Sequence, residues 1–221
     1  MRYNFAVKRD LNMHNNYDLP ADILAEVKKC AAVIREGGIA AYPTDTVYGL
    51  GADVYKDGAV RKIFTVKQRT LNLPLPILIA DISQLNELAA DIPPLAMKLI
   101  AKFWPGALTI VFKASPAFNS LALAGSSKVA ARMPDHAITL RLIREARCPI
   151  VGTSANLHNL PAVLTATEVR EQLGNAVDFI LDAGACPGGI ESTIVDVTLD
   201  PPAILRTGAI SEKELVELFS R

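Results

Sequence analysis

The sequence has no long hydrophobic run and no surplus of charge of either sign. Its 23 lysines and arginines are balanced by 23 aspartates and glutamates, so no overall field favours nucleic acid or a membrane surface. The longest apolar run that we find, 73–80, is far shorter than the ~20 residues that a membrane-spanning helix requires. The first eighteen residues contain no apolar core of the kind found in signal peptides. We therefore expect a protein without membrane attachment, in which any anion-binding site is local.

Cysteine and histidine are scarce. The three cysteines are Cys30, Cys148 and Cys186. A scattered, odd-numbered set without a CxxC pair is typical of reduced thiols, so we expect a cytoplasmic protein without disulfides. The three histidines are His14, His136 and His158. No two of them have the spacing of metal ligands on one helix, so we predict no metal site and expect surface histidines.

Internal repeats, linkers and low-complexity segments are also missing. The 13 glycines and 14 prolines are close to average usage, which excludes collagen-like and low-complexity chains. Because 50% of the residues are hydrophobic, a chain of 221 residues can bury a large core without disulfides. The alternation of strands and helices runs without a break, so we predict one domain over residues 1–221.

Hydrophobic periodicity predicts the strands and helices that alternate along the chain. The predicted strands are Ile39–Tyr42, Ile77–Ala80, Leu108–Phe112, Val129–Arg132, Pro149–Thr153, Phe179–Leu181, Thr193–Val197 and Ala203–Leu205. The predicted helices are one with Ile23, Val27, Cys30 and Ile34 on its apolar face, Ala59–Val66, Leu95–Trp104, Ile138–Arg147, and two opened by the capping boxes Thr165–Glu168 and Ser211–Glu214. This order indicates an α/β fold in which helices flank a mixed sheet.

Two common nucleotide and hydrolase motifs are incomplete. Gly49 and Gly51 begin a dinucleotide-binding fingerprint, but Val54 occupies its third glycine position. The segment 152–156 resembles the GxSxG turn of serine hydrolases, but Asn156 replaces the last glycine. A Rossmann site and a serine hydrolase are therefore both disfavoured.

Polar side chains follow two predicted buried strands directly. Thr44 and Asp45 come after the first strand, and Thr153, Ser154 and Asn156 end the strand near residue 150. Ligands of α/β sheets bind beyond the carboxyl ends of strands, so these groups could contact a small molecule. Turn residues that cap backbone amides are the equally weighted alternative for residues 44–46.

Four cations are candidates for an anion site. Lys67 and Arg69 close one predicted helix, where they could either interact with its dipole in solvent or converge on a polyphosphate. Arg132 and Arg206 end apolar strands, where burial is costly unless the guanidinium meets an anion. Taken together, the cations and hydroxyls suggest a cleft for a nucleotide and a small polar acid on one rim of one sheet.

Several ordered motifs add a family resemblance. They are Tyr42 to Gly51 (YPTDTVYGLG), Lys67-x-Arg69, Pro74-Leu75, Phe103 to Gly106 (FWPG), Arg132 to His136 (RMPDH), Thr153 to Asn156 (TSAN), Glu191 to Thr193 (EST) and Leu205 to Ile210 (LRTGAI). Together they resemble the YrdC/TsaC family over about residues 26–210. Residues 1–18 form an N-terminal extension outside the resemblance.

The resemblance implies a twisted mixed sheet around a basic concave cleft and L-threonylcarbamoyladenylate synthase activity. In that reaction L-threonine, bicarbonate and ATP give threonylcarbamoyl-AMP and pyrophosphate for the t6A modification of tRNA. It also implies Mg²⁺ together with ATP, and contact with tRNA or with downstream threonylcarbamoyl-transferase proteins.

The resemblance also implies roles for individual residues. The ATP-binding residues that it implies are Lys67, Arg69, Ser154, Asn156 and Arg206, and the threonine-binding residues are Thr44, Arg132 and Ser192. Lys67 and Arg69 would act in catalysis by offsetting charge on the triphosphate and the leaving pyrophosphate. We expect Lys67 to be reachable from solvent, so that Lys67→Ala would weaken ATP binding and leave the fold intact.

Two other functions stay open at this point. An RNA-binding module is one, because a basic cleft attracts RNA, although the balanced charge counts against it. A paralogue on the same scaffold with a different acyl substrate is the other.

Overall fold

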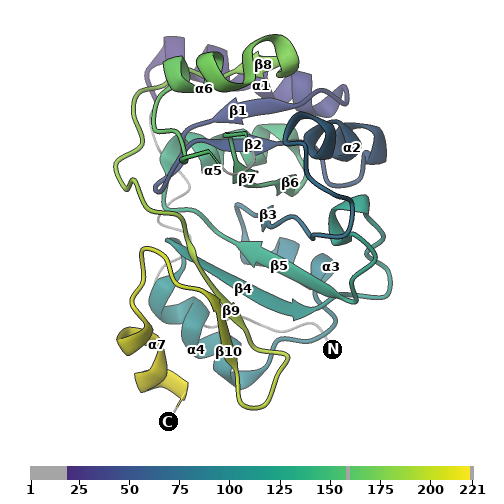
Figure 1. Cartoon of the computed structure of the whole chain (residues 1–221), viewed down its shortest axis with the longest axis vertical. Coiled ribbons are helices and arrows are strands. Elements are labelled where there is room, and N and C mark those ends of the chain that lie inside the picture. Colours follow the sequence, from purple (N-terminus) through teal and green to yellow (C-terminus); the bar gives the residue numbers. More distant parts are fainter. Residues whose placement is uncertain (1–18, 158–159, 220–221) are drawn as a thin grey trace.

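Two mixed β-sheets form the centre of the computed structural model, which describes residues 19–157 and 160–219 (Figure 1). The four-stranded sheet has the order β7 (Thr153–Ser154), β2 (Gly49–Gly51), β1 (Ala40–Tyr42) and β8 (Phe179–Ile180). The six-stranded sheet has the order β10 (Ala203–Arg206), β9 (Thr193–Asp196), β4 (Leu108–Lys113), β5 (Lys128–Arg132), β3 (Ile77–Leu78) and β6 (Ile150–Val151). Each sheet contains both parallel and antiparallel neighbours.

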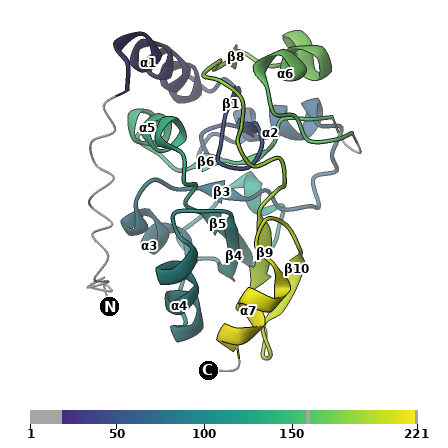
Figure 2. The same cartoon turned by 90° about the vertical axis from the view of Figure 1, so that its left-hand side faces the viewer.

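Helices flank both sheets. The α-helices are α1 (Ala21–Arg35), α2 (Asp57–Val66), α3 (Leu85–Leu88), α4 (Pro94–Phe103), α5 (Ala137–Ala146), α6 (Ala166–Leu173) and α7 (Glu212–Phe219), and the short 3₁₀ helices are Ile82–Gln84, Leu121–Leu123 and Gly174–Ala176. Helices α1, α5 and α6 lie by the four-stranded sheet, whereas α4 and α7 lie together beside the six-stranded sheet (Figure 2). The predicted fold class is confirmed, but the predicted single sheet is two sheets.

The change from one sheet to two occurs within a segment that the sequence predicts as one strand. Residues 150–151 form β6 in the larger sheet and residues 153–154 form β7 in the smaller one, with Gly152 between them. The Gly152 N–H donates to Pro76 O at 2.8 Å, and a Cβ there would lie 2.3 Å from Leu78 Cγ. A side chain at residue 152 would displace the buried Leu78 side chain, so glycine suits this crossing, and period-2 hydrophobicity gives no sign of it.

Local sequence signals place several helix ends and one strand irregularity. The capping box at Thr165 and Glu168 opens α6, as predicted. A β-bulge lies in β10, where Ile204 pairs with Val195 and Arg206 pairs with Ile194. Leu205 is therefore an extra residue, and the bulge lets both Leu205 and Arg206 reach the same cleft.

The buried residues form one continuous hydrophobic core across both sheets. In α1 the buried positions Val27, Cys30, Ala31 and Ile34 recur at the spacing of a helix, so this face packs inward. Among residues 19–157 and 160–219, no helix has the length and apolar character needed to cross a membrane.

The histidine prediction needs a correction. His136 is half-buried rather than a surface residue, and its Nδ1 lies 3.4 Å from Thr139 N at the start of α5. Burial lowers the pKa of His136, although Asp45 and Asp135 raise it in part. His14 and His158 lie outside the described residues.

Candidate functional site

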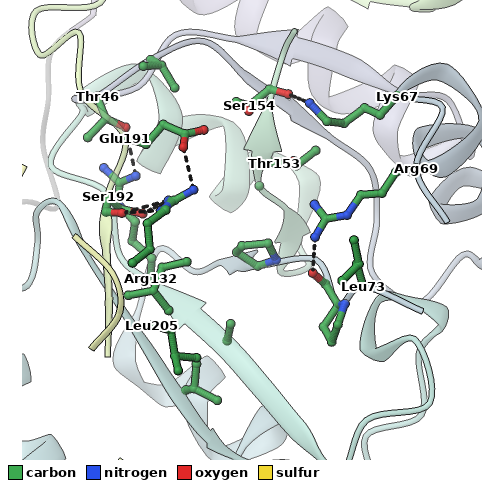
Figure 3. Close-up of a pocket in the computed structure, with 18 of the residues that line it drawn as sticks. Thr46, Lys67, Arg69, Leu73, Arg132, Thr153, Ser154, Glu191, Ser192 and Leu205 are labelled. Carbon is green, nitrogen blue, oxygen red and sulfur yellow. Dashed lines mark hydrogen bonds and ion pairs between the residues drawn. The ribbon is translucent and has the colours of Figure 1, made fainter. Parts of the chain in front are cut away.

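A cleft of about 680 Å³ is lined by residues from both sheets (Figure 3). Seven of the eight residues predicted to bind substrates line it: Lys67, Arg69, Arg132, Ser154, Asn156, Ser192 and Arg206. Thr44 does not line it. The site therefore lies across two sheets rather than on one rim of one sheet.

A helix-ending motif places Lys67 and Arg69 on the cleft. Lys67 ends α2, Gln68 adopts the left-handed conformation with φ 51°, and Arg69 N donates to Phe64 O at 2.9 Å. The companion bond from Gln68 N to Thr65 O measures 3.0 Å. These two bonds are those of a Schellman motif, which turns the chain sharply after the helix. Both cations thus line the cleft while Gln68 between them is exposed.

Lys67 is buried, which contradicts the expectation that solvent reaches it. Its exposed fraction is 4%, and Nζ donates to Ser154 O at 2.5 Å, Asn156 O at 2.7 Å and Asn156 Oδ1 at 3.1 Å. All three ammonium protons therefore have protein acceptors. Burial, helped by the nearby Arg69 cation, lowers the pKa of Lys67 to about 8. Lys67 joins the end of α2 to the segment after β7.

In residues 154–156, at the end of β7, some polar groups bond within the protein and others are open to the cleft. The Asn156 amide is occupied at both ends, because Oδ1 accepts from Lys67 and Nδ2 donates to Leu160 O at 2.5 Å. Within the described part of the chain, the Ser154 hydroxyl has no hydrogen-bond partner. Ser154 Oγ can therefore contact a ligand without breaking a bond.

Arg69 has the least occupied guanidinium of the cleft. Its NH2 group donates to Pro74 O at 3.2 Å. Its Nε is the one buried side-chain nitrogen or oxygen without a partner among the described residues. Burial and then the Arg206 cation lower the pKa of Arg69. A buried donor without an acceptor is costly, so this arginine suits an anionic ligand.

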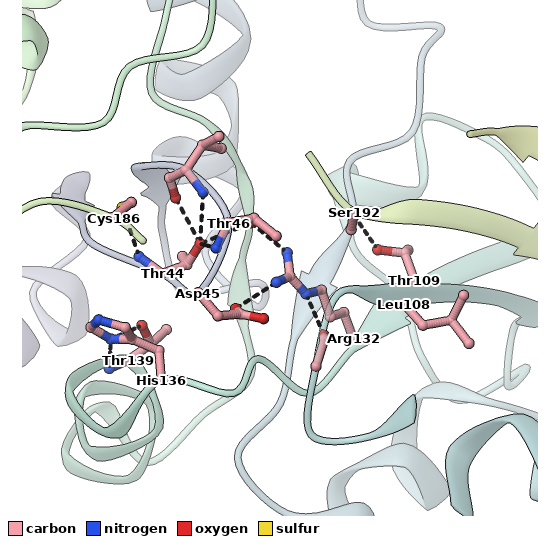
Figure 4. Close-up of polar contacts among 12 residues, drawn as sticks. Thr44, Asp45, Thr46, Leu108, Thr109, Arg132, His136, Thr139, Cys186 and Ser192 are labelled. Carbon is pink, nitrogen blue, oxygen red and sulfur yellow. Dashed lines mark hydrogen bonds and ion pairs between the residues drawn. The ribbon is translucent and has the colours of Figure 1, made fainter. Parts of the chain in front are cut away.

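Arg132 lies between the loop after β1 and the six-stranded sheet (Figure 4). NH2 forms an ion pair with Asp45 Oδ1 at 2.5 Å, NH1 donates to Thr46 Oγ1 at 3.0 Å, and Nε donates to Gly106 O at 2.9 Å. Arg132 is only 6% exposed, so these contacts fix its orientation at the cleft.

Thr44 supports this loop from behind. Its hydroxyl accepts from Thr46 N at 3.1 Å and from Val47 N at 3.2 Å, and it donates to Val47 O at 2.7 Å. Thr46 and Val47 line the cleft instead. The turn interpretation of Thr44 thus describes its observed contacts, and Thr46 is the cleft-lining threonine of the motif.

Ser192 and Arg206 are joined by hydrogen bonds. Arg206 Nε and NH2 donate to Ser192 O at 3.1 and 2.8 Å, and NH2 lies 3.2 Å from Ser192 Oγ. Ser192 Oγ also lies 2.8 Å from Thr109 Oγ1. Arg206 NH1 forms an ion pair with Glu191 Oε2 at 2.7 Å. The bulge in β10 thus brings Arg206 against the residues just before β9.

The rest of the cleft lining consists of an apolar floor and a lysine that forms an ion pair. Val111, Ala130 and Ile194 line it from three adjacent strands, β4, β5 and β9. Lys128 Nζ forms an ion pair with Asp196 Oδ2 at 2.8 Å. Burial raises the pKa of Asp196, but hydrogen bonds from Lys128 and Thr198 outweigh it and lower that pKa.

The cleft can hold an elongated ligand with anionic groups and an apolar middle. Three cations lie close together at one end, because, in addition to burial, the Arg69 charge lowers the pKa of Lys67 and the Arg206 charge lowers the pKa of Arg69. Arg132 supplies a planar fork suited to a carboxylate. The described residues contain no group of three histidine, cysteine, aspartate or glutamate side chains that could hold a metal ion.

Four polar residues that complete the site were not among the predicted substrate-binding residues, although three of them lie inside motifs that the sequence singles out. Asp45 orients Arg132, Thr109 pairs with Ser192, and Glu191 pairs with Arg206. Thr46 stands beside the predicted Thr44. The available signal was position in the sequence, because Asp45 adjoins the predicted Thr44 and Glu191 adjoins the predicted Ser192. The sequence does not show that these carboxylates lie near Arg132 and Arg206.

Comparisons with known proteins agree on one family. A family model described as "Telomere recombination" (Sua5_yciO_yrdC) matches residues 32–208. Threonylcarbamoyl-AMP synthases from Bacillus subtilis and Pyrococcus abyssi are 41% and 40% identical over 86% and 88% of this chain. The crystal structure of P. abyssi Sua5 complexed with L-threonine superposes with a TM-score of 0.85 at 39% identity over 88% of this chain.

The matched relatives are longer than this chain. The matches cover 55% of the B. subtilis protein, and 57% of both the P. abyssi protein and the chain in its crystal structure. The chain therefore spans little more than half the length of these relatives.

Proposed function

The chain belongs to the Sua5/YciO/YrdC family, and on that premise we propose that it is a threonylcarbamoyl-AMP synthase. The threonine amine attacks the carbon of bicarbonate, water leaves, and a carbamate forms. A carbamate oxygen then attacks the α-phosphorus of ATP, and pyrophosphate leaves with the electrons of the broken P–O bond. No protein nucleophile is required, so catalysis comes from positioning and charge stabilisation.

Arg132 and the loop after β1 are suited to L-threonine. The Arg132 fork would bind the threonine carboxylate, and Thr46 and Ser192 would hydrogen-bond its polar groups. Thr44 would act by holding Thr46 and Val47 in their turn. The relative from P. abyssi has been crystallised with L-threonine, which supports this ligand class.

The other cations are suited to ATP. Arg69, with its unpaired Nε, and Arg206 would bind phosphate oxygens, and the Ser154 hydroxyl would add a neutral donor. Lys67 would contribute its charge from behind and keep the Ser154–Asn156 segment in position. The apolar floor of Val111, Ala130 and Ile194 would accommodate the adenosine.

Mg²⁺ would come with the ATP phosphates. Mg²⁺ prefers oxygen ligands and often uses substrate phosphates with one or two carboxylates. Glu191 is the one cleft carboxylate beside the phosphate-binding cations in the described ranges, and it is already paired with Arg206. The chain's own residues thus fit phosphate-borne Mg²⁺ better than a dedicated protein site.

The product would serve the t6A modification of tRNA, with transfer proteins as the downstream partners. All three cysteines are free and buried, the state expected in a reducing compartment, so we propose a cytoplasmic enzyme. We also propose that the described residues act as one domain, because a single core runs through both sheets.

The convergence of Lys67, Arg69, Arg132 and Arg206 on one cleft supports this function most strongly. The test is pyrophosphate release by the purified protein with ATP, bicarbonate and threonine. We expect release to stop when threonine or bicarbonate is omitted, and Arg69→Met to lower the rate at least tenfold, as for loss of one charge-stabilising donor. Arg61→Met, which changes an exposed arginine on α2, the helix that precedes Arg69, should leave the rate unchanged. Release that persists without threonine would reject the proposed reaction.

A further inference from the structure

Glu191 is a charged cleft residue to which the proposed reaction assigns no role of its own, and it lies beside the cations proposed to bind phosphate. Its carboxylate forms the 2.7 Å ion pair with Arg206, and the exposed fractions of the two side chains are 38% and 37%. Both residues of this ion pair line the cleft, a position that an ion pair does not need if it only stabilises the fold. Because both partners remain open to solvent, the Glu191 side chain can leave Arg206 without disrupting the core.

The carboxylate also acts on the other two cations at this end of the cleft. Burial lowers the pKa of Lys67 and of Arg69, and the charge of Glu191 offsets part of that lowering for both. The other two cleft cations already have separate carboxylate partners, because Lys128 pairs with Asp196 and Arg132 with Asp45. Three cations therefore share one carboxylate.

The backbone of Glu191 is fixed, which confines any movement to its side chain. Glu191 O accepts from Ala209 N at 2.9 Å. A Cβ at Gly208 would lie 2.2 Å from Glu191 O and 2.6 Å from the carbonyl carbon of Ser192. The two backbone segments are thus in direct contact, whereas the half-exposed carboxylate retains its rotamer freedom.

We propose that Glu191 is a built-in counter-ion of the phosphate-binding cations, and that the phosphates of an incoming ligand displace its carboxylate from Arg206. Because we take ATP as the ligand, the proposal rests on the proposed function. In the free protein one carboxylate limits the repulsion among three cations. A polyphosphate carries more charge and more acceptor oxygens, so it outcompetes the carboxylate, whereas a singly charged anion does not. Glu191 thereby selects for ligands that carry two or more phosphate charges.

The test measures the affinity for inorganic pyrophosphate without Mg²⁺, by titration calorimetry. Glu191→Gln keeps the shape of the side chain and removes its charge. We expect the variant to bind pyrophosphate roughly five-fold more tightly at low salt, the order of magnitude of one partly exposed ion pair. The gain should shrink as salt screens the cleft. Glu191→Ala should show the same gain, which excludes an effect of the new amide.

The matched control is Glu145→Gln. Glu145 also pairs with an arginine, because its Oε1 lies 2.6 Å from Arg141 NH2 on α5, but it does not line the cleft. This variant loses the same charge and should bind pyrophosphate as the unmodified protein does. The melting temperature of every variant, which should stay within about 2 °C of the original for a surface substitution, checks that the fold is intact.

Two results would overturn the counter-ion role. If both Glu191 variants bind pyrophosphate no more tightly than the unmodified protein, the carboxylate does not compete with phosphates for the cations. An equal gain in Glu145→Gln would reduce the effect to overall charge. The proposed function is tested separately by threonine-dependent pyrophosphate release, so a protein that fails that assay can still support the displacement of Glu191.

Discussion

Lys67 shows how a cleft residue whose charged group is occupied by protein acceptors can organise the segment beside it. Its motif suggests a solvent-reachable phosphate contact, but its ammonium group is occupied by Ser154 O, Asn156 O and Asn156 Oδ1. The sequence predicts the residue and its charge. It does not reveal that the three acceptors come from a segment 87 to 89 residues further along the chain. Side-chain contacts of this separation depend on the whole fold.

We expect Lys67→Met to lower both stability and ATP affinity. Methionine keeps much of the length of the side chain but leaves two buried carbonyls and one amide oxygen without their donor, which costs about 2 kcal/mol of unfolding free energy. The melting temperature should fall by about 4–8 °C for a chain of this size. Thermal unfolding and ATP titration on the same preparation measure the two effects.

Lys29→Met is the matched control for that substitution. The Lys29 side chain is 65% exposed and pairs with Glu26 on the same helix turn. Its loss should change stability by less than about 0.5 kcal/mol, as surface substitutions do. If Lys67→Met melts at the same temperature as this control, the three hydrogen bonds do not stabilise the segment after β7.

At the scale of single elements, the end of α2 carries a conformation that its residue does not favour. Gln68 has φ 51°, and for a residue with a Cβ this left-handed conformation costs about 1–2 kcal/mol. Gln68→Gly should remove that cost and lose about 0.5–1 kcal/mol in backbone entropy, for a net gain of about 0.5 kcal/mol. Denaturant unfolding measures the change.

Gln68→Val should act in the opposite direction, because a β-branched side chain is even less suited to positive φ. Both variants should retain pyrophosphate release, since Gln68 is exposed and does not line the cleft. A stabilising valine would show that the turn relaxes away from the Schellman geometry.

The sequence predicts most elements but not how the sheets divide. Periodicity finds nine of the ten strands in the described residues wholly or in part, and capping motifs mark both predicted boxes, because these signals are local. It misses β2, whose Gly-Leu-Gly sequence has little strand propensity, and it joins β6 to β7. Both failures involve glycines that lie close to residues distant in the sequence. A Cβ at Gly51, for example, would lie 2.5 Å from Val151 O.

At the scale of the whole molecule, the cleft links two sheets, so ligand binding should stabilise both. The six-stranded sheet contributes Arg132 and Arg206, and the smaller sheet contributes Ser154 and the loop that carries Thr46. With ATP and threonine each at about 100 times its dissociation constant, each ligand adds about 2.7 kcal/mol. The melting temperature should then rise by roughly 10–20 °C.

Hydrogen exchange locates this stabilisation. Protection should increase in residues 44–47 and 153–156 as well as in residues 191–194, because the residues proposed to bind or position the ligands lie in all three segments. Increased protection in only one sheet would contradict a site shared by the two sheets. A melting temperature that does not change when both ligands are added would contradict it as well.

The close approach at Gly208 sets a boundary for redesign of the cleft. Any side chain at this position would overlap the carbonyl of Glu191, so a library that randomises residue 208 would consist mainly of misfolded members. Thr46, Val111 and Ala130 line the same cavity from strands and turns that do not meet this obstacle. Efforts to make the scaffold accept a different amino acid should therefore vary Thr46, those aimed at a different nucleotide should vary Val111 and Ala130, and both should leave the glycine unchanged.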